Sequence, residues 1–155
     1  MLWVVRQHKL RNIANGAQLE EAFSKHTALA PRLQRVVLER LSLSSQMSLL
    51  ASSSALLAVH GQAMAWVLFL PSGSRHTAAV EIFPAGLVNH IYRELSHTLG
   101  VHYEEVGARA AAGCKMGAST ATKLMCNVTV SVENVLAAAA RAAEWTAGGG
   151  APAVA

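Results

Sequence analysis

The stretch LLAVHGQAMAWVLFLP occupies residues 56–71, and AVEIFP follows at residues 79–84. A short apolar run ends at His60 and Gly61, and a second apolar segment begins at once and ends at Pro71. This pattern predicts a buried strand, a tight turn and a buried helix. In open α/β sheets, ligands bind where the strands end and the helices begin. His60 and Gly61 are therefore candidate ligand-binding residues.

Gly61 suits a ligand site because a glycine allows an unusual backbone turn and a close approach by a ligand. The helix predicted to follow it presents free N–H groups and the positive end of its dipole, which suit a phosphate group. The role of His60 is less certain from the pattern alone. A histidine that closes an apolar strand is, by itself, more often structural than catalytic.

The residues of this region resemble the signature of glycosyltransferase family 61. That family includes O-linked GlcNAc transferases of the secretory pathway and plant xylan arabinosyl- and xylosyltransferases. Its pattern is His-Gly-Ala-(Gly or Gln)-Leu, then Phe-Leu-Pro, then Glu-(Leu or Ile)-x-Pro. The matching residues are His60, Gly61, Phe69, Leu70, Pro71, Glu81, Phe83 and Pro84. Residues 62–64 depart from the pattern, because Gln-Ala-Met stands there and a bulkier residue follows the glycine.

A basic loop follows the first predicted strand, residues 2–5. It resembles the family pattern Arg-x-x-x-x-Arg-x-Ile-x-Asn, with Arg6, Arg11, Ile13 and Asn15 in the matching places. The resemblance implies that Arg6 and Arg11 hold the diphosphate of a sugar nucleotide. Guanidinium groups suit this role because they bind phosphate oxygens in bidentate fashion. Composition alone favours a solvated basic loop.

Glu81 interrupts an apolar strand, where an unpaired carboxylate is costly. It could accept both ribose hydroxyls of a nucleotide, as acids do in dinucleotide folds, or form a structural salt bridge with Arg75 or Arg93. Glu39, at the end of the second predicted strand, is expected to be a solvated charge, with a ligand contact as the alternative. Trp66 is expected in the core, with stacking on a uracil base as the alternative.

The pattern along the chain predicts a Rossmann-like α/β fold, a mostly parallel sheet flanked by helices. Strands are expected at residues 2–5, 34–38, 55–59, 78–83, 101–106 and 127–130. Helices are expected at residues 18–25, 89–99 and 132–145, with two more beginning near Ser42 and after Gly61. Residues 101–106 are expected near an edge of the sheet and 107–122 in a loop. Residues 1–146 are expected to form one nucleotide-sugar-binding domain, followed by a disordered tail at 147–155.

Composition sets limits on the class of protein. The chain has 155 residues, enough for one domain with a core, and 52% of them are hydrophobic. Either a surface that packs against a partner domain or richness in alanine accounts for this apolar balance. The formal net charge is +4, yet no run of Lys and Arg appears. A nucleic-acid partner is therefore not expected.

The two cysteines, Cys114 and Cys126, form no C-x-x-C pair, so a zinc site is not expected. They could form one disulfide or remain two free thiols. The sequence contains no aspartate, and so lacks the Asp-x-Asp motif of the other large class of glycosyltransferases. Chemistry without a metal is the consistent expectation. Asn127-Val128-Thr129 matches the N-glycosylation sequon.

The resemblance implies an enzyme that transfers a sugar from a UDP-sugar donor to a hydroxyl of a glycan or glycoprotein, with inversion and without a cofactor. Family members carry an N-terminal membrane anchor and a first nucleotide-fold domain. The chain is therefore expected to be the donor-binding, C-terminal half of a GT-B-like enzyme of the Golgi or endoplasmic reticulum. The catalytic base is expected in the missing N-terminal domain or at the cleft, so no residue is assigned to it. The alternative is an inactive remnant, which the change at residues 62–64 motivates.

Overall fold

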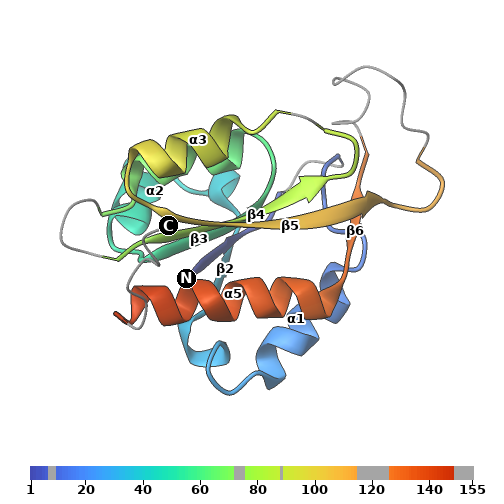
Figure 1. Ribbon diagram of the computed structural model, residues 1–155, viewed down its shortest axis with the longest axis horizontal. Helices are drawn as coiled ribbons and strands as arrows, with labels where there is room; N and C mark the ends of the chain where they lie inside the picture. The colour runs from blue at the N-terminus through green and yellow to red at the C-terminus, as the bar shows by residue number, and fades with distance from the viewer. Residues whose placement is uncertain (7–9, 72–75, 88, 115–125, 149–155) are drawn as a thin grey trace, which may run out of the picture.

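The computed structural model describes residues 1–6, 10–71, 76–87, 89–114 and 126–148. A six-stranded sheet forms its centre, in the order β2-β1-β3-β4-β5-β6 (Figure 1). Strands β1 to β5 run parallel, and β6 pairs antiparallel with β5. The strands are β1 (Leu2–Val4), β2 (Gln34–Val36), β3 (Ala55–Val59), β4 (Ala78–Pro84), β5 (His102–Ala110) and β6 (Val128–Val130). The predicted Rossmann-like α/β fold is confirmed.

Helices cover both faces of the sheet, as Figure 1 shows. The α-helices are α1 (Gly16–Lys25), α2 (Leu43–Ala51), α3 (Ile91–Thr98) and α5 (Val132–Thr146). Short 3-10 helices are η1 (Ala30–Arg32), η2 (Leu38–Arg40) and η3 (Gln62–Phe69). The helices α1 and α5 pack on one face, and α2, η3 and α3 pack on the other. Among the described residues, no helix is long and apolar enough to span a bilayer.

Strand β3 shows why the central apolar run is continuous. Leu57 and Val59 pack in the core beneath α1 and α5, whereas Leu56 and Ala58 pack in the core on the opposite face. All five residues of the strand are buried. A strand of a parallel sheet that is covered on both sides has no solvent face and therefore no polar alternation.

The strand order places a crevice at the carboxyl ends of β1 and β3. The chain leaves β1 to form β2 on one side, and β3 lies on the other side. At such a reversal in strand order, the two connections diverge and open a ligand site in doubly wound folds. Arg6 follows β1, and His60 and Gly61 follow β3. The fold therefore brings the two predicted clusters of site residues to the same crevice.

The structure corrects two details of the predicted elements. The segment after Gly61 is a 3-10 helix rather than an α-helix. Strand β5 continues through residues 107–110, which were expected in a loop. Residues 102–106 of this strand lie at the edge of the described sheet, as expected, because β6 pairs only with Ala108, Arg109 and Ala110. The parts of the predicted loop and tail at residues 115–122 and 149–155 lie outside the described residues.

Candidate functional site

Two guanidinium groups meet above Gly61. A Cβ placed on this glycine would lie 2.7 Å from Nη1 of Arg11 and 3.1 Å from Nη2 of Arg6. Gly61 has φ +135° and ψ −164°, a backbone conformation that is essentially restricted to glycine. Glycine is therefore needed here for its backbone geometry and for the room that it leaves to the two arginines. The sequence predicted close approach of a ligand, and the structure shows arginine side chains on that face of the backbone.

The two arginines form a concentrated positive charge. Within the described residues, neither guanidinium lies within salt-bridge distance of a carboxylate. Burial and, second, the charge of Arg11 lower the pKa of Arg6, and the charge of Glu39 opposes this shift. Bringing two like charges together without a counter-ion costs free energy, which an anion bound between them would relieve.

A cavity of about 410 Å³ opens beside these arginines. Arg6 and Arg11 line it together with Ala14, Gly16 and Ala17, which lie at the start of α1. The N-terminus of an α-helix carries unsatisfied N–H groups and partial positive charge, which stabilise anions. The arginines and the N-terminus of α1 thus both present positive charge to this cavity.

The β1–α1 loop that carries Arg11 is anchored to β6. The N–H of Ala14 donates to the carbonyl of Val128 at 2.7 Å, and the N–H of Asn12 donates to Oδ1 of Asn127 at 2.9 Å. Arg11 has φ +61°, which is uncommon for a residue with a side chain. The hydrogen bonds to a strand more than a hundred residues away hold the loop in this conformation.

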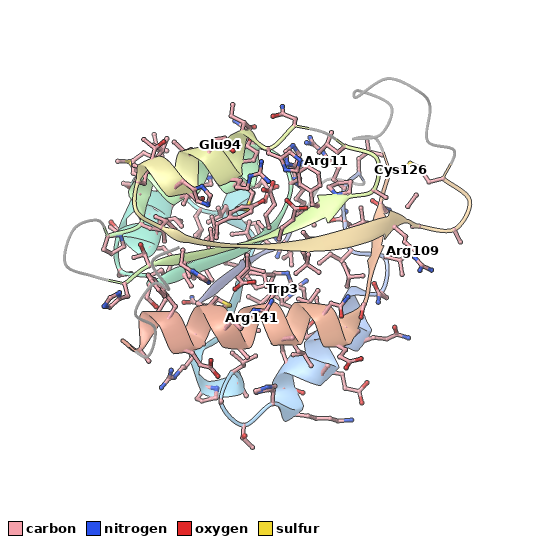
Figure 2. The ribbon with its side chains drawn as sticks, in the orientation of Figure 1. Trp3, Arg11, Glu94, Arg109, Cys126 and Arg141 are labelled. Carbon is pink, nitrogen blue, oxygen red and sulfur yellow. A yellow bond between two sulfur atoms is a disulfide. The ribbon has the colours of Figure 1, made fainter. Side chains whose placement is uncertain are left out.

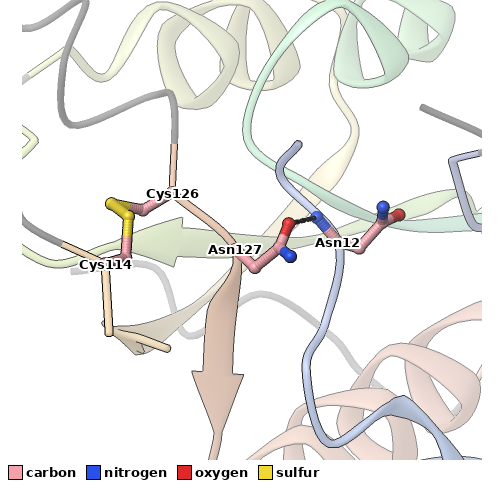
Figure 3. The surroundings of a disulfide bond; sticks show 4 residues. All are labelled: Asn12, Cys114, Cys126 and Asn127. Carbon is pink, nitrogen blue, oxygen red and sulfur yellow. Dashed lines mark hydrogen bonds between the residues drawn. A yellow bond between two sulfur atoms is a disulfide. The ribbon is translucent and has the colours of Figure 1, made fainter. Parts of the chain in front are cut away.

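Cys114 and Cys126 form a disulfide beside this anchor (Figure 3). Of the two states that the sequence left open, the disulfide is the one observed. Cys126 immediately precedes Asn127, the residue that accepts the hydrogen bond from the arginine loop. The disulfide therefore ties down the chain that supports the loop. Glycosylation of Asn127 stays a prediction.

His60 is held by a buried hydrogen-bond network. Its Nδ1 lies 2.5 Å from Oε1 of Glu81, and the hydroxyl of Tyr103 donates to Oε2 of Glu81 at 2.5 Å. Burial and, next, the hydrogen bond to Glu81 raise the pKa of Tyr103, so its hydroxyl stays a donor. Glu81 is 0% exposed and both of its oxygens are engaged. Its predicted contact with a ribose stays a prediction.

Tyr92 contacts His60 and is also influenced by the charges of Arg6 and Arg11. Its ring meets the His60 ring edge-on, with centroids 5.2 Å apart. Burial and, second, the charge of Glu81 raise the pKa of the Tyr92 hydroxyl, and the charges of Arg11 and Arg6 oppose this. The tyrosine thus lies within electrostatic range of both parts of the site.

The structure places the five residues that the sequence singled out for donor binding in two groups. The guanidinium groups of Arg6 and Arg11 lie beside Gly61, whereas His60 and Glu81 are bonded to each other, are buried and line neither of the two cavities beside Arg6. Sequence reasoning missed Tyr92 and Tyr103. The bond from Tyr103 to Glu81 depends on the alignment of β4 with β5, which no local pattern gives.

No group of three or more metal-binding side chains occurs among the residues that the structure describes. Figure 2 shows Arg11 above the sheet and Arg141 on α5 below it, so the basic site is separate from the charges on α5. Among the described residues, Arg6, Arg11, Arg35 and the start of α1 line the crevice with positive charge, and Arg35 lies 3.7 Å from a carboxylate oxygen of Glu20.

A mostly parallel sheet with a crevice at its switch point defines the class of Rossmann-like α/β proteins. The family model described as Glycosyltransferase 61 matches residues 1–77, which include both arginines, His60 and Gly61. The chain belongs to glycosyltransferase family 61 and is an enzyme, a glycosyltransferase. No curated protein matches it.

Proposed function

We propose that this glycosyltransferase binds a UDP-sugar at the carboxyl ends of β1 and β3 and transfers the sugar to a hydroxyl of a glycan or glycoprotein. The observation that carries this proposal is the meeting of two guanidinium groups, unpaired within the described residues, above Gly61. A diphosphate has the charge and the oxygens to bind both groups at once.

The same arginines would assist the reaction. As the bond between the sugar and the diphosphate breaks, negative charge grows on the departing phosphate oxygen. Positive groups already held in place stabilise this charge without reorganisation. Arg6 and Arg11 therefore supply the electrostatic role that a metal ion fills in metal-dependent transferases, and a metal-independent, inverting transfer with no cofactor is the mechanism we favour.

His60 would contact the donor through Nε2. Its Nδ1–H is donated to Glu81, so Nε2 is left either with a lone pair or, on a protonated ring, with an N–H for a phosphate oxygen. Glu81 acts here through the histidine, because its carboxylate is fully buried. We assign Glu81 the role of a positioning residue, with Tyr103 holding its second oxygen.

We further propose that the chain is the donor-binding half of a GT-B-like enzyme of the Golgi or endoplasmic reticulum, where an N-terminal domain contributes the acceptor side and the catalytic base. The disulfide supports an oxidising compartment, because such bonds are rare where thiols are kept reduced. The exposed side chains of Leu43, Met47 and Leu68 support a further domain contact.

Calorimetric titration of the purified chain with UDP and with inorganic pyrophosphate tests the proposal. We expect Arg6→Ala and Arg11→Ala each to weaken both ligands by about 10- to 100-fold, since charge-assisted hydrogen bonds contribute about 1.5–3 kcal/mol. Arg141→Ala is the matched control, because it removes one positive charge on α5, across the sheet. Absence of binding by the wild-type chain, or equal losses in all three variants, would refute a diphosphate site at these arginines.

A further inference from the structure

A second cavity, of about 380 Å³, lies on the other side of Arg6. It opens between the end of β2, helix α2 and the 3-10 helix η3. The lining residues that matter here are Arg6, Glu39, Gln46, Gln62, Trp66 and Phe69. Its volume is near the lower end of the range of about 300–1,000 Å³ that is typical of small-molecule sites.

Arg6 lines both cavities. A ligand whose phosphate binds Arg6 in the first cavity can therefore extend its other end into the second. Arg11 and the start of α1 line only the first cavity, so the positive charge is concentrated there. The second cavity suits the uncharged part of the same ligand.

The apolar wall of the second cavity consists of aromatic rings. The centroids of Trp66 and Phe69 lie 5.1 Å apart, with the ring planes inclined at 50°. Trp66 is partly exposed and Phe69 is 38% exposed, so neither ring is sealed in the core. Exposed aromatic faces of this kind stack on nucleobases without requiring a particular base.

The polar residues of the cavity have free hydrogen-bonding groups. Glu39 is exposed and, within the described part of the chain, has no salt-bridge partner. Gln46 donates through Nε2 to the carbonyl of Leu41 at 3.0 Å, which leaves its Oε1 as an acceptor. An acid just beyond the second strand is where nucleotide-binding folds of this kind hold ribose hydroxyls.

We propose that the second cavity is the nucleoside subsite of the donor, with Trp66 stacking on the base and Glu39 accepting the ribose hydroxyls. This inference rests on the proposed function, because it takes the diphosphate to lie at Arg6. It assigns the hydrogen bonds to the ribose hydroxyls to Glu39 rather than to Glu81. Glu39 is exposed and unpaired within the described residues, whereas Glu81 is fully buried and already bonded to His60 and Tyr103.

The test compares UDP with inorganic pyrophosphate by calorimetric titration of the purified 155-residue chain. The nucleoside should make UDP bind more tightly than pyrophosphate. Trp66→Ala should weaken UDP on the order of tenfold, as loss of base stacking predicts, and Glu39→Gln should also weaken it. Neither variant should change the affinity for pyrophosphate, whereas Arg6→Ala should weaken both ligands.

Matched controls come from the same chain. Trp145→Ala removes a tryptophan on α5 that stacks on His102, and Glu94→Gln removes an exposed carboxylate on α3 that lines neither cavity. Trp66→Phe retains an apolar ring if the alanine variant fails to fold, and Glu39 is exposed, so its variant carries little risk to folding.

The outcomes separate the two proposals. If UDP binds no better than pyrophosphate, or if changes at Trp66 and Glu39 leave UDP binding intact, the nucleoside subsite is refuted and the diphosphate site stands. If the wild-type chain binds neither ligand, the proposed function fails and the subsite fails with it.

Discussion

Nδ1 of His60 lies 2.5 Å from Oε1 of Glu81, and the two residues come from neighbouring parallel strands. The sheet fixes this relationship, because the backbone N–H of His60 also donates to the carbonyl of Ile82 at 2.9 Å. Tyr103, from the next strand, donates to the other oxygen of Glu81. Three adjacent strands therefore set the orientation of one buried imidazole ring, next in the chain to Gly61.

We expect Glu81→Gln to weaken donor binding while the fold is retained. The amide can no longer act as an ionised acceptor for both Nδ1 of His60 and the hydroxyl of Tyr103. Loss of hydrogen bonds to a buried charge should cost about 1.5–3 kcal/mol in unfolding free energy. Urea denaturation measures this loss, and titration with UDP measures the effect on the ligand.

Tyr103→Phe separates orientation from stability. It removes the second support of Glu81 and leaves the bond from His60 in place. We expect a loss of stability similar in size to one charged hydrogen bond, about 1.5–3 kcal/mol, with a smaller effect on UDP binding than in Glu81→Gln. Equal effects of both variants on UDP binding would contradict a positioning role that acts through His60.

Gly61→Ala should abolish binding of UDP and pyrophosphate. The added Cβ would lie 2.7 Å from Nη1 of Arg11 and 3.1 Å from Nη2 of Arg6 and would displace these side-chain ends, and φ +135° is strained for alanine, at a cost of about 1–3 kcal/mol. Gly100→Ala is the control, since Gly100 also has a positive φ, of +68°, but has no atom within 4 Å of its Cβ position. Both variants should lose stability in thermal unfolding, and only Gly61→Ala should lose the ligands. Retention of pyrophosphate binding by Gly61→Ala would refute the site.

The sequence was sufficient to predict the strands that carry the site. The apolar runs at residues 55–59 and 78–83 are continuous because both faces of β3 and β4 are covered. Parallel strands end at the same edge, so the positions of Arg6, His60 and Gly61 at that edge followed from the order of elements. The family resemblance then pointed to phosphate chemistry.

Other features depend on distant pairing and have no local signal. Strand β5 extends through Gly107 and Arg109 because β4 and β6 offer backbone partners, which overrides the weak strand preference of a Gly- and Ala-rich segment. The contact of Arg11 with Gly61 depends on a loop that β6 holds from more than a hundred residues away. The bond from Tyr103 to Glu81 requires the register of two strands.

The ion pair between Glu104 and Arg141 should make stability depend on pH. Arg141 donates to both oxygens of Glu104, and the distances are 2.8 Å and 3.1 Å. Burial alone would raise the pKa of Glu104, but hydrogen bonds from Arg141 and then His102 outweigh it and hold the pKa below its usual 4.5. The ionised carboxylate is thus favoured in the folded state, and its stabilisation is present above pH 4.5 and is lost as the pH falls through the lowered pKa.

Arg141→Ala should therefore reduce the unfolding free energy by about 1 kcal/mol at neutral pH, a modest value because the arginine is exposed and screened. The difference from wild type should shrink as the pH is lowered below 4.5. Arg141→Lys retains the charge and loses the bidentate geometry, so its unfolding free energy should lie between those of the wild type and of Arg141→Ala. Urea unfolding at a series of pH values measures all three, and a constant difference across the series would show that Arg141 acts through packing.

The disulfide should support the ligand site through β6 and the arginine loop. Replacing Cys114 and Cys126 together with serine removes a covalent link across 12 positions, which chain-entropy arguments value at roughly 3 kcal/mol. Because Asn127 and Val128 anchor the loop of Arg11, we expect weaker binding of pyrophosphate as well as lower stability. Asn127→Ala should reproduce the loss of binding with the disulfide intact, since it removes the acceptor for the N–H of Asn12. Unfolding with and without reductant measures the loss of stability, and titration with pyrophosphate measures the loss of binding. If the serine variant loses stability but binds pyrophosphate as tightly as the wild type does, the hydrogen bonds of Asn127 and Val128 hold the arginine loop without the disulfide.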